Sequence, residues 1–258
     1  MCELFGVSAK RPIIVNEYLR EFVSHSCNHP NGWGIAVFYD GAVSLEKEPV
    51  TASKSAYLKE RLKHKVEAKN MVAHIRLATI GAEKYENCHP FIRRDNSGRA
   101  WTLIHNGTIF DSRTLDQYFV KQEGKTDSER ILYYLIDEID RKAAELNREL
   151  TDSERFDVVS SVIREITPNN NKVNLIIYDS TQFYVHTNMR GTLYRKQSDE
   201  GTVFSTLPLD KGNWEPLPLT QLLAYEDGEL KYSATPHNNE YIYDAAQMKY
   251  IYLESASL

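Results

Sequence analysis

Cys2 directly follows the initiator methionine in the opening segment MCELFGVSA, at the most exposed end of the chain, where a thiol has no obvious structural role. Two later segments, AHIRLATIG and IHNGTIF, read as apolar strands that end in polar residues. The first places Arg76 and Thr79 where a strand runs into a loop, and the second places Asn106 and Gly107 at a similar point. Polar side chains beside glycine at strand ends suit a ligand, because the backbone can approach closely there.

Each of these strand ends also has an ordinary structural explanation. Arg76 can make a surface ion pair. Asn106 and Gly107 form the dipeptide that most strongly signals a hairpin turn. Taken singly, either segment fits the structural explanation better than the functional one.

The pentapeptide TDSER occurs at 126–130 and again at 151–155, each time before an amphipathic pattern. Each copy fits a capping box, in which a threonine and a glutamate three residues later satisfy the first backbone N–H groups of a helix. Capping alone therefore explains both copies. It predicts equal stability losses of about 1 kcal/mol or less for Asp127→Asn and Asp152→Asn.

Cysteine and histidine spacing argues against a metal site or a disulfide framework. The chain has 3 cysteines and no basic segment followed by an apolar one at its start, as a secretion signal has. His25, Cys27 and His29 lie two residues apart, and Cys88 and His89 are adjacent. Structural zinc sites usually have two matched ligand pairs, which this spacing lacks. We therefore expect no metal.

Bulk composition excludes several classes of protein. A formal net charge of -5 argues against a nucleic-acid binder held by counterion release. No apolar run approaches the length of a membrane-spanning helix, so we expect no membrane insertion and a cytoplasmic location. With 258 residues and 41% hydrophobic residues, the chain can bury a sizeable core.

Hydrophobic periodicity predicts an α+β fold with helices outside antiparallel sheets. The helical segments are NEYLREFV, SAYLKERLKHK, ILYYLIDEIDRKAAEL and RFDVVSSVIREI. WGIAVFYDG followed by AVSLEKE predicts a hairpin. Further strands are expected at CELFGVSA, NMVAHIRLA, WTLIHNG, KVNLIIYDS, QFYVHT, TLYRK, TVFST, QLLAYEDGELKY and EYIYD.

The segments MCELFGVSA, NGWGIAVF, HIRLATIG, NCHPF, HNGTI and TDSE, in this order, resemble the class II glutamine amidotransferases, and most of all their stand-alone, YafJ-type branch. The later segment FSTLPLDKGNWEPLP is also similar to that branch, so the resemblance spans most of the chain. It implies an N-terminal nucleophile hydrolase fold, which is a four-layer αββα sandwich of two antiparallel sheets flanked by helices. It also implies that residues 1–258 form a single domain.

The resemblance gives Cys2 a role. It implies that Met1 is removed, that the Cys2 thiolate attacks the side-chain amide of glutamine, and that the α-amino group of Cys2 acts as general base. An α-amino group titrates at about 7.7–8.0 and a free thiol at about 8.5, so a proton can pass between them at little cost near neutral pH.

The resemblance assigns the other roles residue by residue. Arg76 corresponds to the arginine that grips the substrate α-carboxylate, and Asp127 to the carboxylate that receives the α-ammonium. Asn106 and Gly107 correspond to the oxyanion hole, through a side-chain amide and a backbone N–H. Two further residues correspond to the lining of the glutamine pocket: Thr79 and His89. Leu77 and Ile80 depart from the Trp and His that many relatives carry there.

The resulting hypothesis is a glutaminase-type amidotransferase that forms a γ-glutamyl thioester and releases glutamate and ammonia, without a cofactor. Two alternatives stay open: a hydrolase of another γ-glutamyl amide or peptide, and a non-catalytic module that binds an amino acid. Because the family-like fold takes up nearly the whole chain, either a separate synthase subunit accepts the ammonia or the protein is a plain hydrolase, and its small-molecule partner is glutamine or another γ-glutamyl compound.

Overall fold

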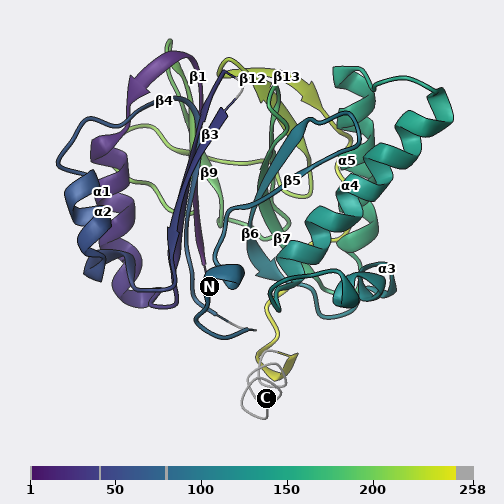
Figure 1. Cartoon of the computed structure of the whole chain (residues 1–258), viewed down its shortest axis with the longest axis horizontal. Coiled ribbons are helices and arrows are strands. Elements are labelled where there is room, and N and C mark those ends of the chain that lie inside the picture. The colour runs from purple at the N-terminus through teal and green to yellow at the C-terminus, as the bar shows by residue number, and fades with distance from the viewer. Residues whose placement is uncertain (1, 41, 79–80, 248–258) are drawn as a thin grey trace.

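The computed structural model describes residues 2–40, 42–78 and 81–247, and places two sheets face to face between outer layers of helices (Figure 1). The strand pairs found in these ranges are all antiparallel. The layer order is helix, sheet, sheet, helix. The predicted α+β class, with two antiparallel sheets flanked by helices, is therefore confirmed.

The first sheet holds the start of the chain near its centre. Across this sheet, the described strands follow the order β11 (Glu215–Pro216), β9 (Tyr194–Gln197), β10 (Gly201–Ser205), β1 (Glu3–Ile14), β4 (Glu67–Ile75), β2 (Trp33–Tyr39) and β3 (Ala42–Glu48). Because β1 pairs with both β10 and β4, the N-terminal residues are held between two neighbouring strands. Figure 1 shows the N-terminus at the lower edge, between the two sheets.

The second sheet carries the HNG segment. Its described strands follow the order β13 (Glu229–Ser233), β12 (Leu223–Glu226), β8 (Phe183–His186), β7 (Lys172–Tyr178), β6 (Ala100–Thr108) and β5 (Phe91–Arg94). Within β6, Asn106 lies opposite Asn174 of β7, and Thr108 lies opposite Lys172. Asn106 and Gly107 are therefore inside a strand, and the hairpin-turn alternative for them is wrong.

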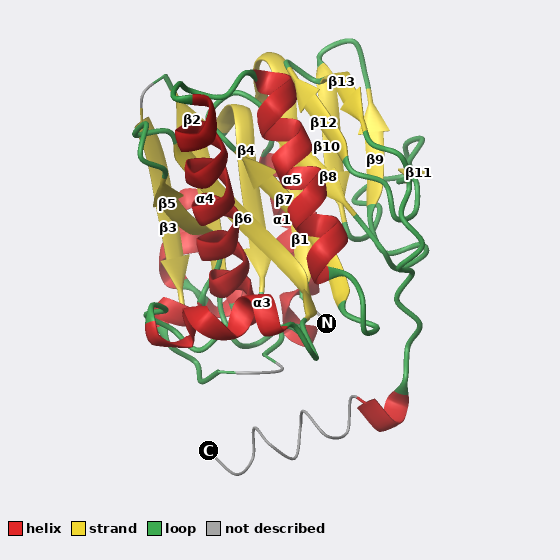
Figure 2. Ribbon diagram, turned by 90° about the vertical axis from the view of Figure 1, so that its right-hand side faces the viewer, coloured by secondary structure: helices red, strands yellow, loops and turns green. Residues whose placement is uncertain are grey.

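Helices cover the outer face of each sheet. The α-helices that cover the sheets are α1 (Asn16–Ser24) and α2 (Ala56–Arg61) on the first sheet and α4 (Asp127–Leu146) and α5 (Asp152–Ile166) on the second, and the short α3 (Arg113–Asp116) lies next to α4. Figure 2 shows α4 and α5 running side by side across the second sheet. Among the described helices, none combines the length and the apolar character needed to cross a bilayer.

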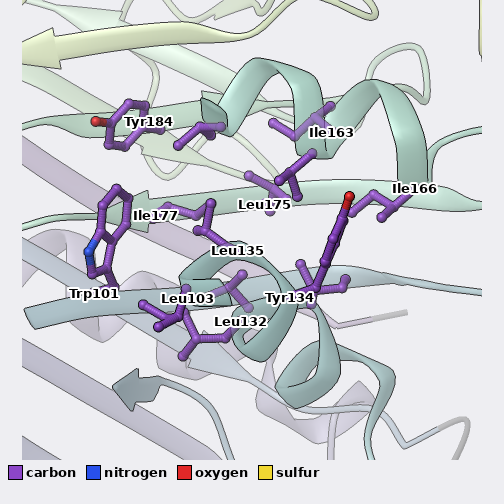
Figure 3. Packing of buried hydrophobic residues seen from close by; sticks show 14 of the residues in the cluster. Trp101, Leu103, Leu132, Tyr134, Leu135, Ile163, Ile166, Leu175, Ile177 and Tyr184 are labelled. Carbon is purple, nitrogen blue, oxygen red and sulfur yellow. The ribbon is translucent and has the colours of Figure 1, made fainter. Parts of the chain in front are cut away.

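Three apolar clusters hold the four layers together. Strand residues alternate between faces, so that Leu103 of β6 packs under α4 and α5 while Ile104 packs between the sheets. Figure 3 shows the cluster on the helix side of the second sheet, to which Trp101, Leu135 and Ile163 all belong. Full burial of one such large side chain stabilises the fold by about 1.5–3 kcal/mol.

The two TDSER copies start helices in different ways. Around Thr151 the capping box is complete, because Thr151 accepts from the N–H of Glu154 and Glu154 accepts from the N–H of Thr151. Thr126 likewise accepts from the N–H of Glu129, at 3.3 Å. The Glu129 carboxylate, however, accepts from the backbone of 123–124 and from Arg93. The predicted second half of the first capping box is therefore wrong, since Glu129 ties down the preceding loop instead.

One element prediction is wrong and another is too long, and in both places groups distant in the sequence satisfy the backbone. EYIYD forms no strand: Tyr241 N donates to Asn188 O at 2.7 Å, and Ile242 N donates to Asn170 Oδ1 at 2.9 Å. The helix predicted over SAYLKERLKHK ends as α2 after six residues. There Asn16 Nδ2 donates to the carbonyl oxygen of His64 at 2.8 Å.

The glycines of NGWG allow the loop before β5 to pack tightly on β2. A Cβ atom on Gly34 would lie 2.1 Å from the carbonyl oxygen of His89, and one on Gly32 would lie 2.6 Å from Cys88 Sγ. Gly32 also has a φ of 131°, which side chains disfavour. This approach brings the His89 ring onto His74 of β4, with 4.1 Å between the ring centroids.

Candidate active site

Strand alternation collects polar side chains at one end of the space between the sheets. The inter-sheet core includes Leu4, Val72, Ile104 and Ile176, one from each of β1, β4, β6 and β7. Positions an even number of residues away share the same face of each strand. Toward the end where the chain begins, those positions carry Cys2, His74, Arg76, Asn106, Asn174 and Lys172. Residues far apart in sequence therefore meet beside the N-terminus.

Cys2 lies at this end of β1, where it is partly buried. Its Sγ donates to the carbonyl oxygen of Leu77 at 3.3 Å. Since Glu3 lies opposite Ile75 in the β1–β4 register, Cys2 is a neighbour of Arg76. Burial raises the pKa of the Cys2 thiol, while the Leu77 hydrogen bond and the positive charges of Arg76 and Lys172 act to lower it.

The Asn106 carboxamide is held by a hydrogen bond at its oxygen, while its nitrogen has no hydrogen-bond partner among the described residues. Its side chain is 1% exposed, and its Oδ1 accepts a hydrogen bond from Lys172 Nζ at 3.0 Å. The buried Nδ2 has no hydrogen-bond partner among the residues that the structure describes. Leaving a buried donor without an acceptor costs about 1–3 kcal/mol. A ligand oxygen placed here would remove that cost.

Gly107 follows Asn106 at the tightest point between β6 and β7. A Cβ atom at this position would lie 1.9 Å from the carbonyl oxygen of Lys172 and 2.2 Å from His105 Nε2. No side chain fits at that distance. Position 107 must therefore be glycine for β6 to approach β7 this closely. The backbone of Gly107 then lies beside the Asn106 amide.

Arg76 is buried just beyond the end of β4. Its guanidinium donates to the carbonyl oxygens of Gly81 at 3.0 Å and Ala82 at 3.2 Å, across the loop that follows. It is 3% exposed, which excludes the surface ion pair considered from the sequence. Burial lowers the pKa of Arg76, and the negative charge of Asp127 is among the groups that raise it.

Asp127 is the first residue of α4 and is 8% exposed. Its Oδ2 accepts from the backbone N–H of Ile109 at 2.7 Å, and its Oδ1 accepts from the N–H of Ser128 at 2.8 Å. Asp152, at the same place in the second TDSER copy, has a side chain that is 42% exposed and pairs with Arg155. Only the first aspartate therefore faces the interior near the polar cluster.

His105 links the start of α4 to the start of β7. Its Nδ1 lies 2.9 Å from Ser128 Oγ, and its Nε2 lies 3.1 Å from the carbonyl oxygen of Lys172. That carbonyl can only accept, so the ring proton belongs on Nε2. Burial lowers the pKa of His105, although the negative charge of Asp127 opposes the effect.

Of the two residues predicted to line the glutamine pocket, only His89 is among the residues that the structure describes. Thr79 lies outside the described residues. His89 is buried, and within the described ranges neither of its ring nitrogens has a hydrogen-bond partner. Burial lowers the pKa of His74 to about 3 and that of His89 well below its usual value. Within the described part of the chain, no cluster of His, Cys, Asp or Glu is arranged to hold a metal ion.

A family model described as glutamine amidotransferases class-II matches residues 1–198, the part of the chain that contains all of these polar residues. The chain belongs to the class II glutamine amidotransferases. The motif-based resemblance is thereby confirmed. Among the relatives of this amidotransferase is the uncharacterized protein MJ1515 of Methanocaldococcus jannaschii, which is 30% identical over 90% of this chain and 71% of its own length.

Two further comparisons support the branch and the fold of the amidotransferase. A protein of Escherichia coli named putative glutamine amidotransferase YafJ is 33% identical over 55% of this chain and 56% of its own. The glutamine phosphoribosylpyrophosphate amidotransferase structure from B. subtilis superposes with a TM-score of 0.67 at 19% identity, covering 93% of this chain and 50% of that one. This likeness confirms the expected N-terminal nucleophile hydrolase fold.

Lys172 is the site residue that sequence reasoning missed in this amidotransferase. It opens the apolar segment KVNLIIY, where a lysine before a strand is typical of an exposed strand end. In the structure it is 3% exposed and contacts Asn106. The sequence carries no signal for this contact, because the two residues are 66 positions apart.

Proposed function

We propose that this amidotransferase hydrolyses the side-chain amide of glutamine through a thioester on Cys2, releasing glutamate and ammonia. In this mechanism the Cys2 thiolate attacks the amide carbon, and the carbonyl oxygen becomes an oxyanion. The Asn106 Nδ2 and the Gly107 N–H donate to that oxyanion. Ammonia then leaves, and water hydrolyses the thioester.

The observation that carries this proposal is the buried Nδ2 of Asn106, which has no partner among the described residues and belongs to the polar cluster in which Lys172 contacts Asn106 and acts electrostatically on Cys2. Donors that are fixed before the reaction stabilise a developing negative charge without reorganisation, and they are often the largest catalytic contribution. A regulatory module that only binds an amino acid has no need of such a donor beside a thiol.

Arg76 and Asp127 support a substrate with an α-amino acid end. They carry opposite charges and are both buried, and the negative charge of Asp127 is among the groups that act to raise the pKa of Arg76. A zwitterionic α-carbon presents a carboxylate and an ammonium that match this pair. Both charges would be satisfied by glutamine and equally by another γ-glutamyl compound.

The general base in this proposal is the α-amino group of Cys2 after removal of Met1. Burial lowers the pKa of His74 to about 3, too low for an effective base at neutral pH. The ring of His105 is occupied on both nitrogens by Ser128 and by the Lys172 carbonyl. An α-amino group, which titrates at about 7.7–8.0, is better matched to a thiol.

The proposed function is tested by incubating the Met1-processed protein with glutamine and with a series of γ-glutamyl amides and peptides, and by reading products by mass. Glutamate and ammonia from glutamine support the proposal. Turnover of another γ-glutamyl compound but not of glutamine would replace it with the alternative hydrolase. Ammonia release that appears only after addition of cell extract would point to a separate synthase that accepts the ammonia.

We expect Arg76→Lys to raise the KM for glutamine by about tenfold or more, because lysine keeps the charge but loses the planar fork that binds a carboxylate with two parallel bonds. The same change removes donors to the carbonyls of Gly81 and Ala82. Steady-state kinetics of glutamate release provide the measurement.

Arg94→Lys is the matched control for the Arg76 variant. Arg94 also donates to a backbone carbonyl, that of Gly98 at 2.6 Å, but it belongs to the opposite end of β5 from the site. Its kinetics are expected to equal those of the wild type. An unchanged KM in Arg76→Lys would remove Arg76 from the substrate site.

We expect Asp127→Asn to weaken glutamine use by about tenfold, since a charge-assisted bond to the substrate ammonium contributes roughly 1.5–3 kcal/mol. Asp152→Asn is expected to leave the kinetics unchanged, because Asp152 lies on the exposed side of α5. Equal values of kcat/KM in the two variants would contradict a substrate role for Asp127.

The structure corrects the expectation of equal stability losses for these two variants. Both oxygens of Asp127 accept from backbone N–H groups, so an amide nitrogen at this position would face a donor. Asp127→Asn is therefore expected to lower the free energy of unfolding by about 1–3 kcal/mol, and Asp152→Asn by less than about 1 kcal/mol. Thermal denaturation of the two variants checks the difference.

A further inference from the structure

Lys172 contacts every residue of the HNG segment. Its Nζ donates to Asn106 Oδ1 at 3.0 Å, and its carbonyl oxygen accepts from His105 Nε2 at 3.1 Å. The same carbonyl lies against Gly107, where a Cβ atom would approach it to 1.9 Å. One residue of β7 therefore sets the geometry of the segment assigned to the oxyanion site.

The contact with Asn106 decides which way its carboxamide is turned. Lys172 Nζ donates to Oδ1, so the edge of the amide that faces Lys172 is the oxygen. The nitrogen is then presented on the opposite edge, and this Nδ2 is the buried donor left without a partner in the described structure. Without the lysine, the two edges of the carboxamide would be much closer in energy.

The burial of Lys172 is costly for the fold. The side chain is almost fully enclosed, and burial lowers its pKa to about 7, although the nearby Cys2 raises it. Apolar residues of similar volume usually stabilise such a position as well as, or better than, a buried charge. A lysine at the first position of an otherwise apolar strand is thus better explained by its contacts than by stability.

We propose that Lys172 is a positioning residue for catalysis, which holds the Asn106 carboxamide with Nδ2 turned toward the oxygen that becomes negative. This inference rests on the proposed glutamine hydrolysis. Lys172 acts through Asn106, and it does not contact the substrate. Its effect therefore belongs to the transition state, in which the oxyanion forms, and not to substrate binding.

The first test is Lys172→Met, which keeps an unbranched side chain only one heavy atom shorter and removes the donor. Loss of one oxyanion donor lowers kcat by about 10²–10³-fold. In Lys172→Met the donor is present but misoriented part of the time, so kcat is expected to fall by about tenfold to a hundredfold. The KM is expected to stay within about twofold of the wild type. Lys196→Met is the matched control, since Lys196 is also a partly buried strand lysine with a hydrogen-bonded Nζ. It is expected to keep wild-type kinetics.

A double-mutant cycle separates positioning from a direct effect. If Lys172 acts through Asn106, Lys172→Met in an Asn106→Ala background is expected to lower kcat by less than about threefold further. Losses that multiply would overturn the inference, because they would mean that Lys172 acts on Cys2 or on the fold independently of Asn106. Wild-type kcat in Lys172→Met alone would overturn it as well.

A structural readout keeps the inference testable even if the wild type does not hydrolyse glutamine, an outcome that would refute only the proposed function. The ¹⁵N relaxation of the Asn106 Nδ2 group is expected to report a rigid carboxamide in the wild type and in Lys196→Met, and a mobile one in Lys172→Met. A carboxamide that is equally rigid in all three proteins would overturn the positioning role.

Discussion

Cys2→Ala is expected to lower glutamine hydrolysis by about 10⁴-fold or more, because it removes the only group proposed to form the thioester. Glutamate release provides the kinetic measurement. In the wild type, one molecule of the glutamine-like electrophile diazo-oxo-norleucine is expected to react covalently with Cys2. Mass spectrometry of the N-terminal peptide detects this single addition. A variant that retains Met1 is expected to be inactive as well, since its Cys2 has no free α-amino group to act as base.

The other two cysteines are built-in controls for the Cys2 experiment. Cys27 is exposed, and Cys88 is buried with its pKa raised to about 11, chiefly by burial, so that its thiol stays protonated. Cys27→Ser and Cys88→Ser are expected to retain most of the activity. Labelling at either of these residues, or activity in Cys2→Ala, would refute the assignment of the nucleophile.

Asn106→Ala is expected to lower kcat for glutamine by about 10²–10³-fold with little change in KM, because an oxyanion donor acts mainly in the transition state. The substitution removes the carboxamide whose Oδ1 is held by Lys172 and whose Nδ2 is unpartnered in the described structure. Initial rates over a range of glutamine concentrations separate the two parameters.

Asn70→Ala is the matched control for this variant. Asn70 is a buried asparagine whose Nδ2 lies 3.4 Å from Tyr178 Oη, and it belongs to the opposite end of β4 from Arg76. Its loss is expected to reduce the free energy of unfolding and to leave kcat close to the wild-type value. A rise in KM alone in Asn106→Ala, or an equal kcat loss in Asn70→Ala, would argue against an oxyanion role.

Local sequence patterns were sufficient for most of the elements. Alternating and helical apolar spacing depend on neighbouring residues only, and they correctly predicted β2 with β3, α1, α4, α5 and most strands of both sheets. The failures have a common cause. EYIYD and the end of α2 are decided by side chains from elsewhere in the chain, those of Asn170 and Asn16, which satisfy backbone groups that would otherwise extend a strand or a helix.

For the candidate site too, the sequence shows which residues are present, and the tertiary structure shows how they are arranged. Cys2, Arg76, Asn106 and Asp127 stand in short motifs whose order along the chain is visible without a structure, and these motifs identify the family. Strand pairing within each sheet and the packing of one sheet on the other then place them at the same edge of the sandwich, because each motif stands at one end of a strand or at the start of a helix.

The sequence by itself determined the fold class, the family and the set of residues proposed for catalysis, since each depends on patterns within a few residues. Only the tertiary structure decided which TDSER aspartate faces the interior and which lysine contacts Asn106. The two copies are identical in sequence, so only their surroundings can distinguish Asp127 from Asp152. The Lys172–Asn106 contact joins residues 66 positions apart, and it exists because β6 and β7 pair in one register.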